Sequence, residues 1–462
     1  MTLVTHSGRQ TGGRIGAQMV TKADRASSKH GMLIAIMLLS FVMPFFFSIG
    51  GLKLSAYRLY LLVAAFPVVI GWMKGNAGPI RSADILVIAA ALWMAAALFI
   101  NHGIAAQWEF SGMLVVETVV PYLTARVLIR DYASFRTFVW WYFTIVLLLL
   151  PFALFENLTG KSVLLDLFRP VFQVYYKVNQ EPRMGLFRAQ VSFPHSILFG
   201  AFCASAFALS WYVLSHEKGI FKRIIRPFLV GTAVFSSLSS GAFLAIILQA
   251  FLTAWDEILK SIKNRWKIFA IIFSILYIIL ELASNRNAFQ IIASELTFSS
   301  GSAWNRIHIF NNSIDDIFGN PFFGIGLKEW TRPSWMKSSV DNFWLLVALR
   351  YGIPAFIMLG LAAIMTCWRV GRTPLTGLYA RARTGYLIAF ASLSMAAFTV
   401  HLWDAAYCFL MFLLGCGMWF VDTDQAADVG QTGGKTASGK RTIRYTRFSQ
   451  KSSGASGATE IT

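Results

Sequence analysis

Two arginines stand close together in the stretch RMGLFRAQVSFPH, residues 183–195, which joins a polar segment to an apolar one. The guanidinium group of arginine donates hydrogen bonds in pairs and matches the oxygens of a phosphate, which lysine cannot do. Arg188 is close enough to the apolar boundary to meet a lipid head group, and Arg183 precedes it. The stretch predicts that both arginines bind an anion, with simple attraction to ordinary phospholipid phosphates as the alternative.

A third arginine, Arg306, lies in the polar stretch SGSAWNRIHIFNNSIDDIFGNPFFGIG. Ser302 suits the N-cap of a helix, and the run Gly319-Asn320-Pro321 would end that helix. Between these points large apolar side chains recur at helical spacing, which predicts an amphipathic helix lying along a membrane surface. These side chains are Trp304, Ile307, Phe310, Ile314 and Phe318.

Carboxylate and imidazole groups that could take a proton occur in the same segments. A general base of this kind typically contributes about 10²–10⁴-fold to a rate. Asp341 is favoured because it lies at the membrane edge, between the predicted helix and the next apolar run. A role as the N-cap of that run fits Asp341 equally well. The other candidates are His308, His195, His401 and Asp404.

Two charged residues, Arg350 and Glu117, lie about nine residues into their apolar runs, where an ionised side chain is costly and usually faces a partner or a cavity. Arg350 lies roughly 13 Å below the edge of its run at 1.5 Å per residue. Glu117 lies at a similar depth in another run. We expect these two residues to pair, or to line one outward-facing cavity together with His195. A purely structural ion pair is the alternative.

The composition sets the fold class. The 462 residues are 56% hydrophobic and only 14% charged, whereas soluble proteins carry roughly a quarter charged residues. Continuous apolar runs long enough to cross a bilayer recur along the chain, in place of the alternating segments of a β-barrel. We predict an all-α polytopic membrane protein with about twelve transmembrane helices, at 32–50, 54–73, 83–100, 109–128, 137–156, 191–214, 228–239, 241–258, 268–283, 342–367, 384–400 and 404–420.

The basic residues predict the orientation of these helices. With both ends of the chain in the cytoplasm, the short outside loops hold only Lys53, while the inside loops are rich in Lys and Arg. This is the positive-inside pattern. Two outside loops, 157–190 and 284–341, are long and basic. Their basic residues have two possible explanations. Long loops cross the membrane with less regard to charge, or the outer face binds an anion.

The two ends of the chain differ from the apolar region between them. Residues 1–30 and 421–462 are polar, basic and rich in Gly and Ser, which predicts disordered cytoplasmic tails. The transmembrane domain is expected at 31–420. Asp422-Thr423-Asp424 matches the Asp-x-Asp pattern of metal-dependent sugar transfer, but it falls in the predicted tail with no fold around it.

Several classes of function find no support in the sequence. The net charge of +19 does not indicate nucleic-acid binding, because Lys and Arg are spread over many loops and two tails. The four cysteines lie inside apolar runs and are expected to be small buried side chains. The chain has no P-loop, HExxH or Cys/His motif. We therefore expect neither a metal nor a cofactor.

Two regions resemble the superfamily of O-antigen ligases and O-antigen polymerases, and in particular its exopolysaccharide polymerases. The family has an Arg-bearing helix, a Gly-rich turn, a polar pair ending in Asn and a span with an internal Gly. Similar features occur here in WNRIHIFNNSIDDIFGNPFFGIGL followed by VDNFWLLVALRYGIPAF. The family's arginine before its mid-chain span is matched by FRAQVSFPHSILFG.

The resemblance implies a GT-C-like membrane glycosyltransferase of the bacterial inner membrane that uses no metal. Its donor would be a glycan on undecaprenyl diphosphate, and its acceptor a glycan hydroxyl or the lipid A core. Arg183, Arg188 and Arg306 would bind the diphosphate, and Asp341 or His308 would act as the base. Besides membrane lipids, a flippase and a chain-length regulator are candidate partners; nucleic acid is not.

One departure from the family pattern bears on the activity. Many ligases place a His directly before the Asn, whereas here Asp341 precedes Asn342. This favours polymerisation of exopolysaccharide or O-antigen repeat units, with ligation to lipid A core as an alternative. A flippase or transporter of the same lipid-linked sugars is another alternative, although such carriers usually have two related halves. A non-catalytic scaffold of a secretion complex is a third.

Overall fold

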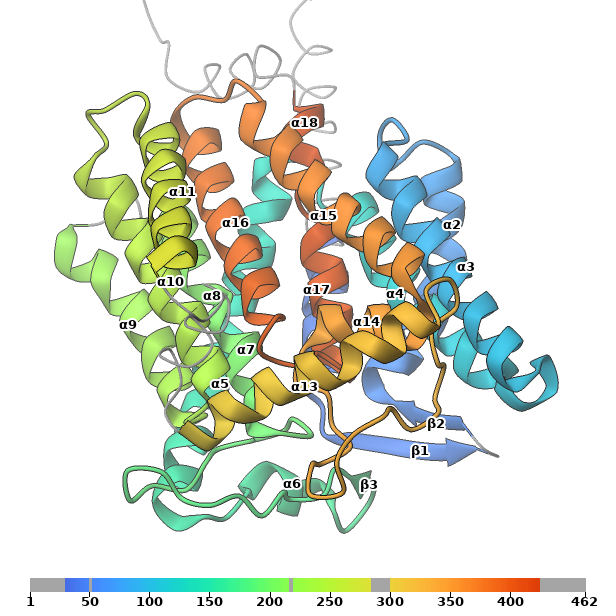
Figure 1. Ribbon diagram of the computed structural model, residues 1–462. Coiled ribbons are helices and arrows are strands. Elements are labelled where there is room, and N and C mark those ends of the chain that lie inside the picture. The colour runs from blue at the N-terminus through green and yellow to red at the C-terminus, as the bar shows by residue number, and fades with distance from the viewer. Residues whose placement is uncertain (1–29, 50–51, 216–218, 284–299, 424–462) are drawn as a thin grey trace, which may run out of the picture. The chain divides into compact units, whose positions relative to one another are not determined.

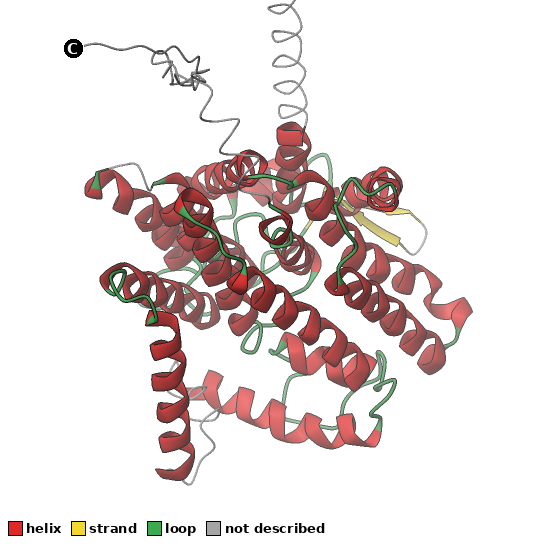
Figure 2. Ribbon diagram, turned by 90° about the horizontal axis from the view of Figure 1, so that it is seen from above, coloured by secondary structure: helices red, strands yellow, loops and turns green. Residues whose placement is uncertain are grey.

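A computed structural model of the protein describes residues 30–49, 52–215, 219–283 and 300–423 (Figure 1). Helices make up most of this part of the chain, and strands are confined to one small patch (Figure 2). The predicted amino-terminal tail, most of the predicted carboxy-terminal tail and part of the second long loop lie outside the described residues.

Nine helical segments in the described part of the chain are long and apolar enough to cross a membrane, as expected of an all-α multi-pass membrane protein. They are α2 (Ala56–Met73), α3 (Ser82–His102), α4 (Ile104–Leu128), α5 (Tyr132–Thr159), the segment Ser196–Leu214, α10 (Ser240–Ile258), α11 (Arg265–Ala283), α15 (Ile353–Arg372) and the segment Asp404–Asp422. The segment Ser196–Leu214 contains α7 (Ser196–Ala204), α8 (Ala206–Leu209) and η1 (Ser210–Leu214). The segment Asp404–Asp422 contains α17 (Asp404–Gly415) and α18 (Trp419–Asp422).

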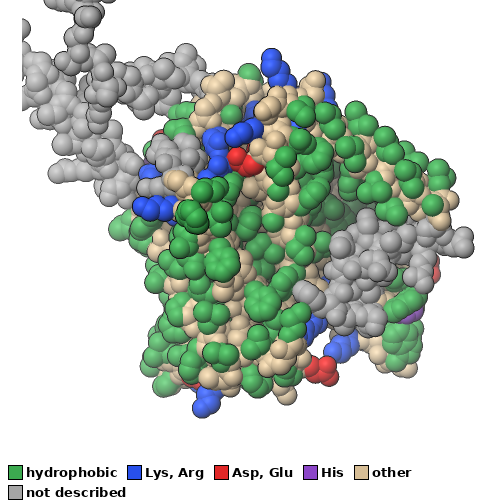
Figure 3. Space-filling model, turned by 90° about the vertical axis from the view of Figure 1, so that its left-hand side faces the viewer, with side chains coloured by type: hydrophobic (Ala, Val, Ile, Leu, Met, Phe, Trp, Pro, Cys, Tyr) green, Lys and Arg blue, Asp and Glu red, His purple; other side chains and the backbone are tan. Residues whose placement is uncertain are grey.

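Further helices complete the bundle. A shorter apolar helix covers His30–Val42, and α9 (Ile220–Ser236) and α16 (Gly377–Ala396) lie among the long helices. Hydrophobic side chains cover the middle of the side seen in Figure 3, and the visible Lys and Arg lie mainly toward its two ends. This distribution fits a protein whose middle faces lipid and whose ends face water.

Two of the predicted runs are not continuous helices. The first, 32–50, was predicted as one helix, but the helix ends at Val42 and the chain continues as a strand. The run 342–367 is broken at Gly352, because this glycine has the left-handed backbone of φ 87° that an α-helix cannot contain. It is divided into α14 (Phe343–Tyr351) and α15. The predicted division between the runs 228–239 and 241–258 is confirmed, since α9 ends at Ser236 and α10 begins at Ser240.

A small antiparallel sheet was not predicted. Strand β1 (Phe45–Ile49) lies between β2 (Leu52–Ser55) and β3 (Gln173–Val174), with Phe46 opposite Ser55 on one side and opposite Gln173 on the other. Consecutive phenylalanines suit a pleated strand as well as a helix. The sheet joins the first long loop to the start of α2, at the end of the bundle that carries α6 (Val163–Phe168) (Figure 1).

The helix predicted in the second long loop is present, although Trp304 and Phe318 of its predicted apolar face are exposed. Helix α13 (Ser300–Gly319) lies across the end of the bundle that also carries the sheet, which we call the α13 end (Figure 1). Its buried side chains Ile309 and Ile317 pack with Leu345 and Leu349 of α14. The burial of this apolar stripe fixes the rotation of α13, and therefore the direction in which its polar face points.

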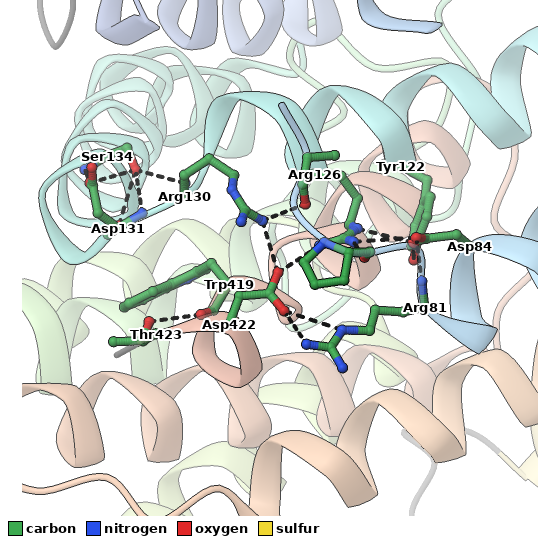
Figure 4. Close-up of polar contacts among 12 residues, drawn as sticks. Arg81, Asp84, Tyr122, Arg126, Arg130, Asp131, Ser134, Trp419, Asp422 and Thr423 are labelled. Atoms are coloured by element: carbon green, nitrogen blue, oxygen red, sulfur yellow. Dashed lines mark hydrogen bonds and ion pairs between the residues drawn. The ribbon is translucent and has the colours of Figure 1, made fainter. Parts of the chain in front are cut away.

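The expectation that Asp422 lies in a tail without a fold around it is wrong. Asp422 ends α18 at the opposite end of the bundle, and its side chain is only 5% exposed. Its carboxylate pairs with Arg81 at 2.5 Å, with Arg130 at 3.0 Å and with Arg126 at 3.4 Å (Figure 4). Asp422 is therefore part of a buried ion network that joins α18 to α4 and to the loops beside α3 and α5.

Candidate functional site

One cavity of about 1440 Å³ collects side chains from both long loops and from α2, α4, α14 and α17. This volume exceeds the roughly 300–1,000 Å³ that is usual for a small-molecule site. Charged and imidazole side chains are concentrated in its wall. The basic ones are Arg58, Arg183, Arg188, Arg306, Lys337 and Arg350; the acidic ones are Glu117, Glu181, Asp341 and Asp404; and the imidazoles are His195 and His401.

A tight hairpin turn positions Arg183. Met184 and Gly185 have left-handed backbones, with φ of 53° and 75°, and Arg183 and Leu186 exchange two backbone hydrogen bonds of 2.9 Å. Such a pair of left-handed residues forms the two-residue turn that reverses an antiparallel pair. The Nη1 of Arg183 also donates to the carbonyl oxygen of Leu238 at 2.8 Å. The turn and this hydrogen bond hold the side chain at the cavity.

Arg188 is held by its two chain neighbours. Phe187 donates its backbone N–H to the carbonyl oxygen of Asn157, and Ala189 donates to that of Ser236, both at 3.0 Å. The amide of Asn157 donates in turn to the carbonyl oxygens of Phe187 and Ser236. The backbone on both sides of Arg188 is thus fixed between α5 and α9, which directs the side chain into the cavity.

The guanidinium of Arg188 has unused hydrogen-bonding capacity. Its Nε is buried without a hydrogen-bond partner, and no carboxylate of the described residues forms an ion pair with it. Burial, with a smaller effect of the neighbouring Arg183, lowers the pKa of Arg188 to about 10. A buried cation without a counter-ion is costly, so an anion in the cavity would be bound favourably here.

His195 is neutral in this arrangement. It is the N-cap of α7, and its Nδ1 accepts a hydrogen bond from the backbone N–H of Ile197 at 3.1 Å, which requires Nδ1 to carry no proton. Burial, and then the positive charge of Arg188, lower the pKa of His195 to about 4. Near neutral pH its remaining ring nitrogen, Nε2, carries the proton and is the donor.

Arg306 and Asp341 meet at the cavity from opposite ends of the second long loop. Burial lowers the pKa of Arg306, while Asp341 acts in the opposite direction. Burial raises the pKa of Asp341, and the charges of Arg306 and Lys337 counteract this effect. The alternative role of Asp341 as an N-cap is wrong, because Asn342 caps α14 by accepting from the backbone N–H of Leu345 at 3.0 Å.

A glycine-rich turn positions Arg350. Backbone N–H groups of Ile325 and Gly326 donate to the carbonyl oxygens of Leu349 and Arg350, at 2.9 and 3.0 Å. Gly324 has a left-handed backbone with φ 60°, and a Cβ atom there would collide with the carbonyl groups of α14. The turn therefore receives the carbonyl groups that the last turn of α14 leaves without helical partners. This contact fixes the end of α14, where Arg350 lines the cavity.

Glu117 and Arg350 both line the cavity, but the ion-pair partner of Glu117 is Arg58. The Nε of Arg58 donates to Oε1 of Glu117 at 2.7 Å, and the hydroxyl of Tyr57 donates to the same oxygen at 2.8 Å. Asp404 is the next carboxylate, with its Oδ1 3.9 Å from Nη2 of Arg58. These four residues connect α2, α4 and α17 at one side of the cavity.

The structure places His308 outside the cavity wall. Its ring packs against those of Trp304 and Trp335, with centroids 6.0 and 5.2 Å away. Trp335 itself lines the cavity and is 66% exposed. The other predicted site residues, Arg183, Arg188, Arg306, Asp341, His195, Glu117 and Arg350, all line the one cavity.

Sequence reasoning missed two basic residues of the site. Arg58 lies in the first turn of α2, inside a predicted span, and the rule that singled out Arg350 applies to it equally. Lys337 lies in a loop and carries no pattern that separates it from a solvated lysine. His401 and Asp404 were considered as proton acceptors and do line the cavity. In the described part of the chain no three His, Cys, Asp or Glu side chains gather as metal ligands.

Comparison with protein-family models gave no match, and comparison with curated proteins gave none either. The cavity and the resemblance of the motifs that supply its arginines are therefore the features that point to a function.

Proposed function

We propose that the protein is a membrane glycosyltransferase that moves a glycan from undecaprenyl diphosphate to the hydroxyl of an acceptor glycan. The observation that carries the proposal is the meeting of Arg183, Arg188 and Arg306 from two separate loops at one cavity. No ion pair joins any of the three to a carboxylate of the described residues. A diphosphate would supply the missing negative charge.

The chemistry of the donor fits such a cavity. The bond between a sugar and a diphosphate already contains the free energy for transfer, so neither a nucleotide nor a cofactor is needed. As this bond breaks, negative charge develops on the leaving diphosphate, and fixed guanidinium groups stabilise that charge. A carboxylate in the cavity wall takes the proton of the incoming hydroxyl. The volume of about 1440 Å³ suits two saccharides better than one small molecule.

The finer topology belongs to the same proposal. Together with the nine long apolar helices, the helix His30–Val42, α9 and α16 would complete twelve spans in a GT-C-like arrangement. Both ends would then lie in the cytoplasm of a bacterium, and the α13 end would lie on the periplasmic side of the inner membrane. The loops beside the network of Asp422 are basic. Cytoplasmic loops are usually rich in Lys and Arg, so this supports the orientation.

Deletion of the gene, followed by profiling of lipid-linked and surface glycans, tests the activity. Loss of a polymerase leaves single repeat units on the lipid carrier, which is the result that we expect. Loss of a ligase leaves long chains on the carrier, and loss of a flippase holds the units on the inner leaflet. Either of these two results would overturn polymerisation in favour of the corresponding alternative.

Complementation with charge-neutral variants tests the cavity. Arg188→Gln and Arg306→Gln should each lower glycan output by about 10–100-fold, since hydrogen bonds to charged groups contribute about 1.5–3 kcal/mol. Arg169→Gln is the matched control, because Arg169 lies in the first long loop, 56% exposed and paired with Asp166. Unchanged output from both cavity variants would contradict the enzyme and favour a scaffold.

A further inference from the structure

Two of the four carboxylates in the cavity wall, Asp341 and Asp404, belong to different groups of charges. Asp341 interacts with Arg306 and Lys337, and Arg306 interacts with Arg183. Asp404 lies instead beside Arg58 and Tyr57. If the proposed function holds, the first group contains the residues that bind the diphosphate, and the second group is left for other chemistry.

Asp404 is held in an unusual backbone conformation. It is the first residue of α17 and has a left-handed backbone, with φ 52°. A residue other than glycine in this conformation is uncommon, although Asp and Asn tolerate it best. Its side chain is 25% exposed, against 10% for Glu117. Of the two carboxylates around Arg58, Asp404 is therefore the one more open to a molecule in the cavity.

Tyr57 lies between the two carboxylates. Its hydroxyl oxygen is 2.8 Å from Oε1 of Glu117 and 3.2 Å from Oδ1 of Asp404. A phenol has one proton and can donate it to only one of these oxygens at a time. Glu117 is nearer and also receives the Nε of Arg58. When Tyr57 donates to Glu117, a lone pair of Tyr57 faces Asp404.

This geometry gives a proton on Asp404 a hydrogen-bond acceptor after the reaction. A protonated Asp404 can donate to the lone pair of Tyr57, because the two oxygens already lie within hydrogen-bond distance. Asp341 has no such acceptor among its contacts in the described residues. Asp341 also lies among the cations that would surround the leaving diphosphate, whereas in a direct displacement the nucleophile approaches the opposite face of the sugar.

We propose that Asp404 is the catalytic base that takes the proton of the acceptor hydroxyl, and that Tyr57, Glu117 and Arg58 position it. The acceptor oxygen forms a bond to the anomeric carbon of the donor sugar, and the bond from that carbon to the diphosphate oxygen breaks. The electron pair of the broken bond leaves with the diphosphate, and the proton moves from the acceptor hydroxyl to Asp404. Asp341 instead affects the net charge of the part of the cavity that binds the diphosphate.

The test compares two isosteric variants in the purified full-length protein. Asp404→Asn keeps the shape and tolerates the left-handed backbone; Asp341→Asn removes the other charge. Transfer from an undecaprenyl-diphosphate-linked repeat unit is measured together with donor binding. Asp404→Asn should lower kcat by about 10²–10⁴-fold and leave donor binding unchanged. Asp341→Asn should bind the donor more tightly and should lose much less of kcat than Asp404→Asn does. Asp166→Asn, in an exposed pair, is the unchanged control.

A second variant separates chemistry from folding. Asp404→Gly tolerates the same backbone and leaves space for a small carboxylate, so added formate should restore part of kcat, in proportion to its concentration. Near-normal kcat in Asp404→Asn would overturn the assignment. So would a loss of folding in both variants at 404, or a failure of formate to rescue a folded Asp404→Gly. An inactive wild-type protein would count against the proposed glycosyltransferase itself.

Discussion

A Cβ atom on Gly352 would collide with the carbonyl oxygen of Phe322, so the break after α14 and the turn after α13 lie backbone against backbone. Hydrogen bonds cross the contact in both directions, from Ile325 to Leu349 and from Ile353 to Pro321. This contact connects the turn that follows α13 to the break between α14 and α15. It therefore sets the distance between α13, which carries Arg306, and the end of α14, which carries Arg350.

Substitution of Gly352 by alanine should disrupt this contact. The left-handed backbone alone costs roughly 1–3 kcal/mol for a residue with a side chain, and the collision with Phe322 adds to it. We expect a lower melting temperature of the purified protein and a loss of glycan output. Gly360→Ala is the matched control, because Gly360 lies in α15 with open space around it. If Gly352→Ala unfolds no earlier than Gly360→Ala, the contact does not stabilise the site.

The donor should stabilise the protein in proportion to its binding. A ligand at 100 times its Kd raises the free energy of unfolding by about 2.7 kcal/mol. Undecaprenyl diphosphate should therefore raise the melting temperature of the wild type, and added salt should reduce this effect at the exposed edge of the site. The effect should be absent from an Arg188→Gln/Arg306→Gln double variant and retained in Arg169→Gln. Equal stabilisation of the double variant would exclude these two arginines as ligands of the diphosphate.

Acid should destabilise the protein through two cavity histidines. The pKa of His195 is about 4 and that of His401 about 3, because both are buried and because Arg188 and Arg350, respectively, repel a second positive charge. In the unfolded chain the pKa of histidine is about 6.5. Between pH 6.5 and about 4 the unfolded chain therefore binds more protons, so stability is fully present above pH 6.5 and falls as the pH falls.

Melting temperatures measured between pH 7 and pH 5 check this prediction. The melting temperature of the wild type should decrease over this range, and that of a His195→Asn/His401→Asn double variant should decrease less. The sign is fixed by the lowered pKa values, so a wild type that becomes more stable in acid would contradict it. An equal decrease in both proteins would assign the pH dependence to other groups.

The ion network at the other end should affect stability and not chemistry. Removal of one partner from a buried ion pair typically costs about 3–5 kcal/mol, because the remaining charges are left buried. Asp422→Asn removes the negative charge that Arg81, Arg126 and Arg130 share. The variant should therefore have a clearly lower melting temperature. Transfer by the folded fraction should stay normal, since the cavity lies at the α13 end. Asp166→Asn, at an exposed pair, should cost at most about 1 kcal/mol.

The helices could be predicted from the sequence because each depends on local information. Apolar runs of sufficient length, the cap signal before Arg306 and the breaker cluster at Gly319-Asn320-Pro321 all act within a few residues of one another. The break at Gly352 was missed because glycine is common inside membrane helices, and only the contact with Phe322 makes this one left-handed. The strand at Phe45–Ile49 was missed because four of its five residues are apolar and continue the preceding run.

The cavity depends on contacts that no local pattern encodes. Arg188 faces it because Asn157 and Ser236 hold the neighbouring backbone, and these residues belong to two different helices. The network of Asp422 combines residues separated by about three hundred positions, so the Asp-x-Asp pattern had no visible partners. Arg58 could have been found from its place inside an apolar run, but its pairing with Glu117 could not.

The network of Asp422 also has a consequence for biosynthesis. Arg81, Arg126 and Arg130 leave the ribosome early, whereas their shared carboxylate is added only when translation reaches residue 422. Until then Arg130 and Arg81 lack the negative charge of Asp422, and the early helices cannot pack against α18. A nascent chain interrupted before this point would lack that contact. Quality-control proteases would therefore degrade it more readily than the full-length protein.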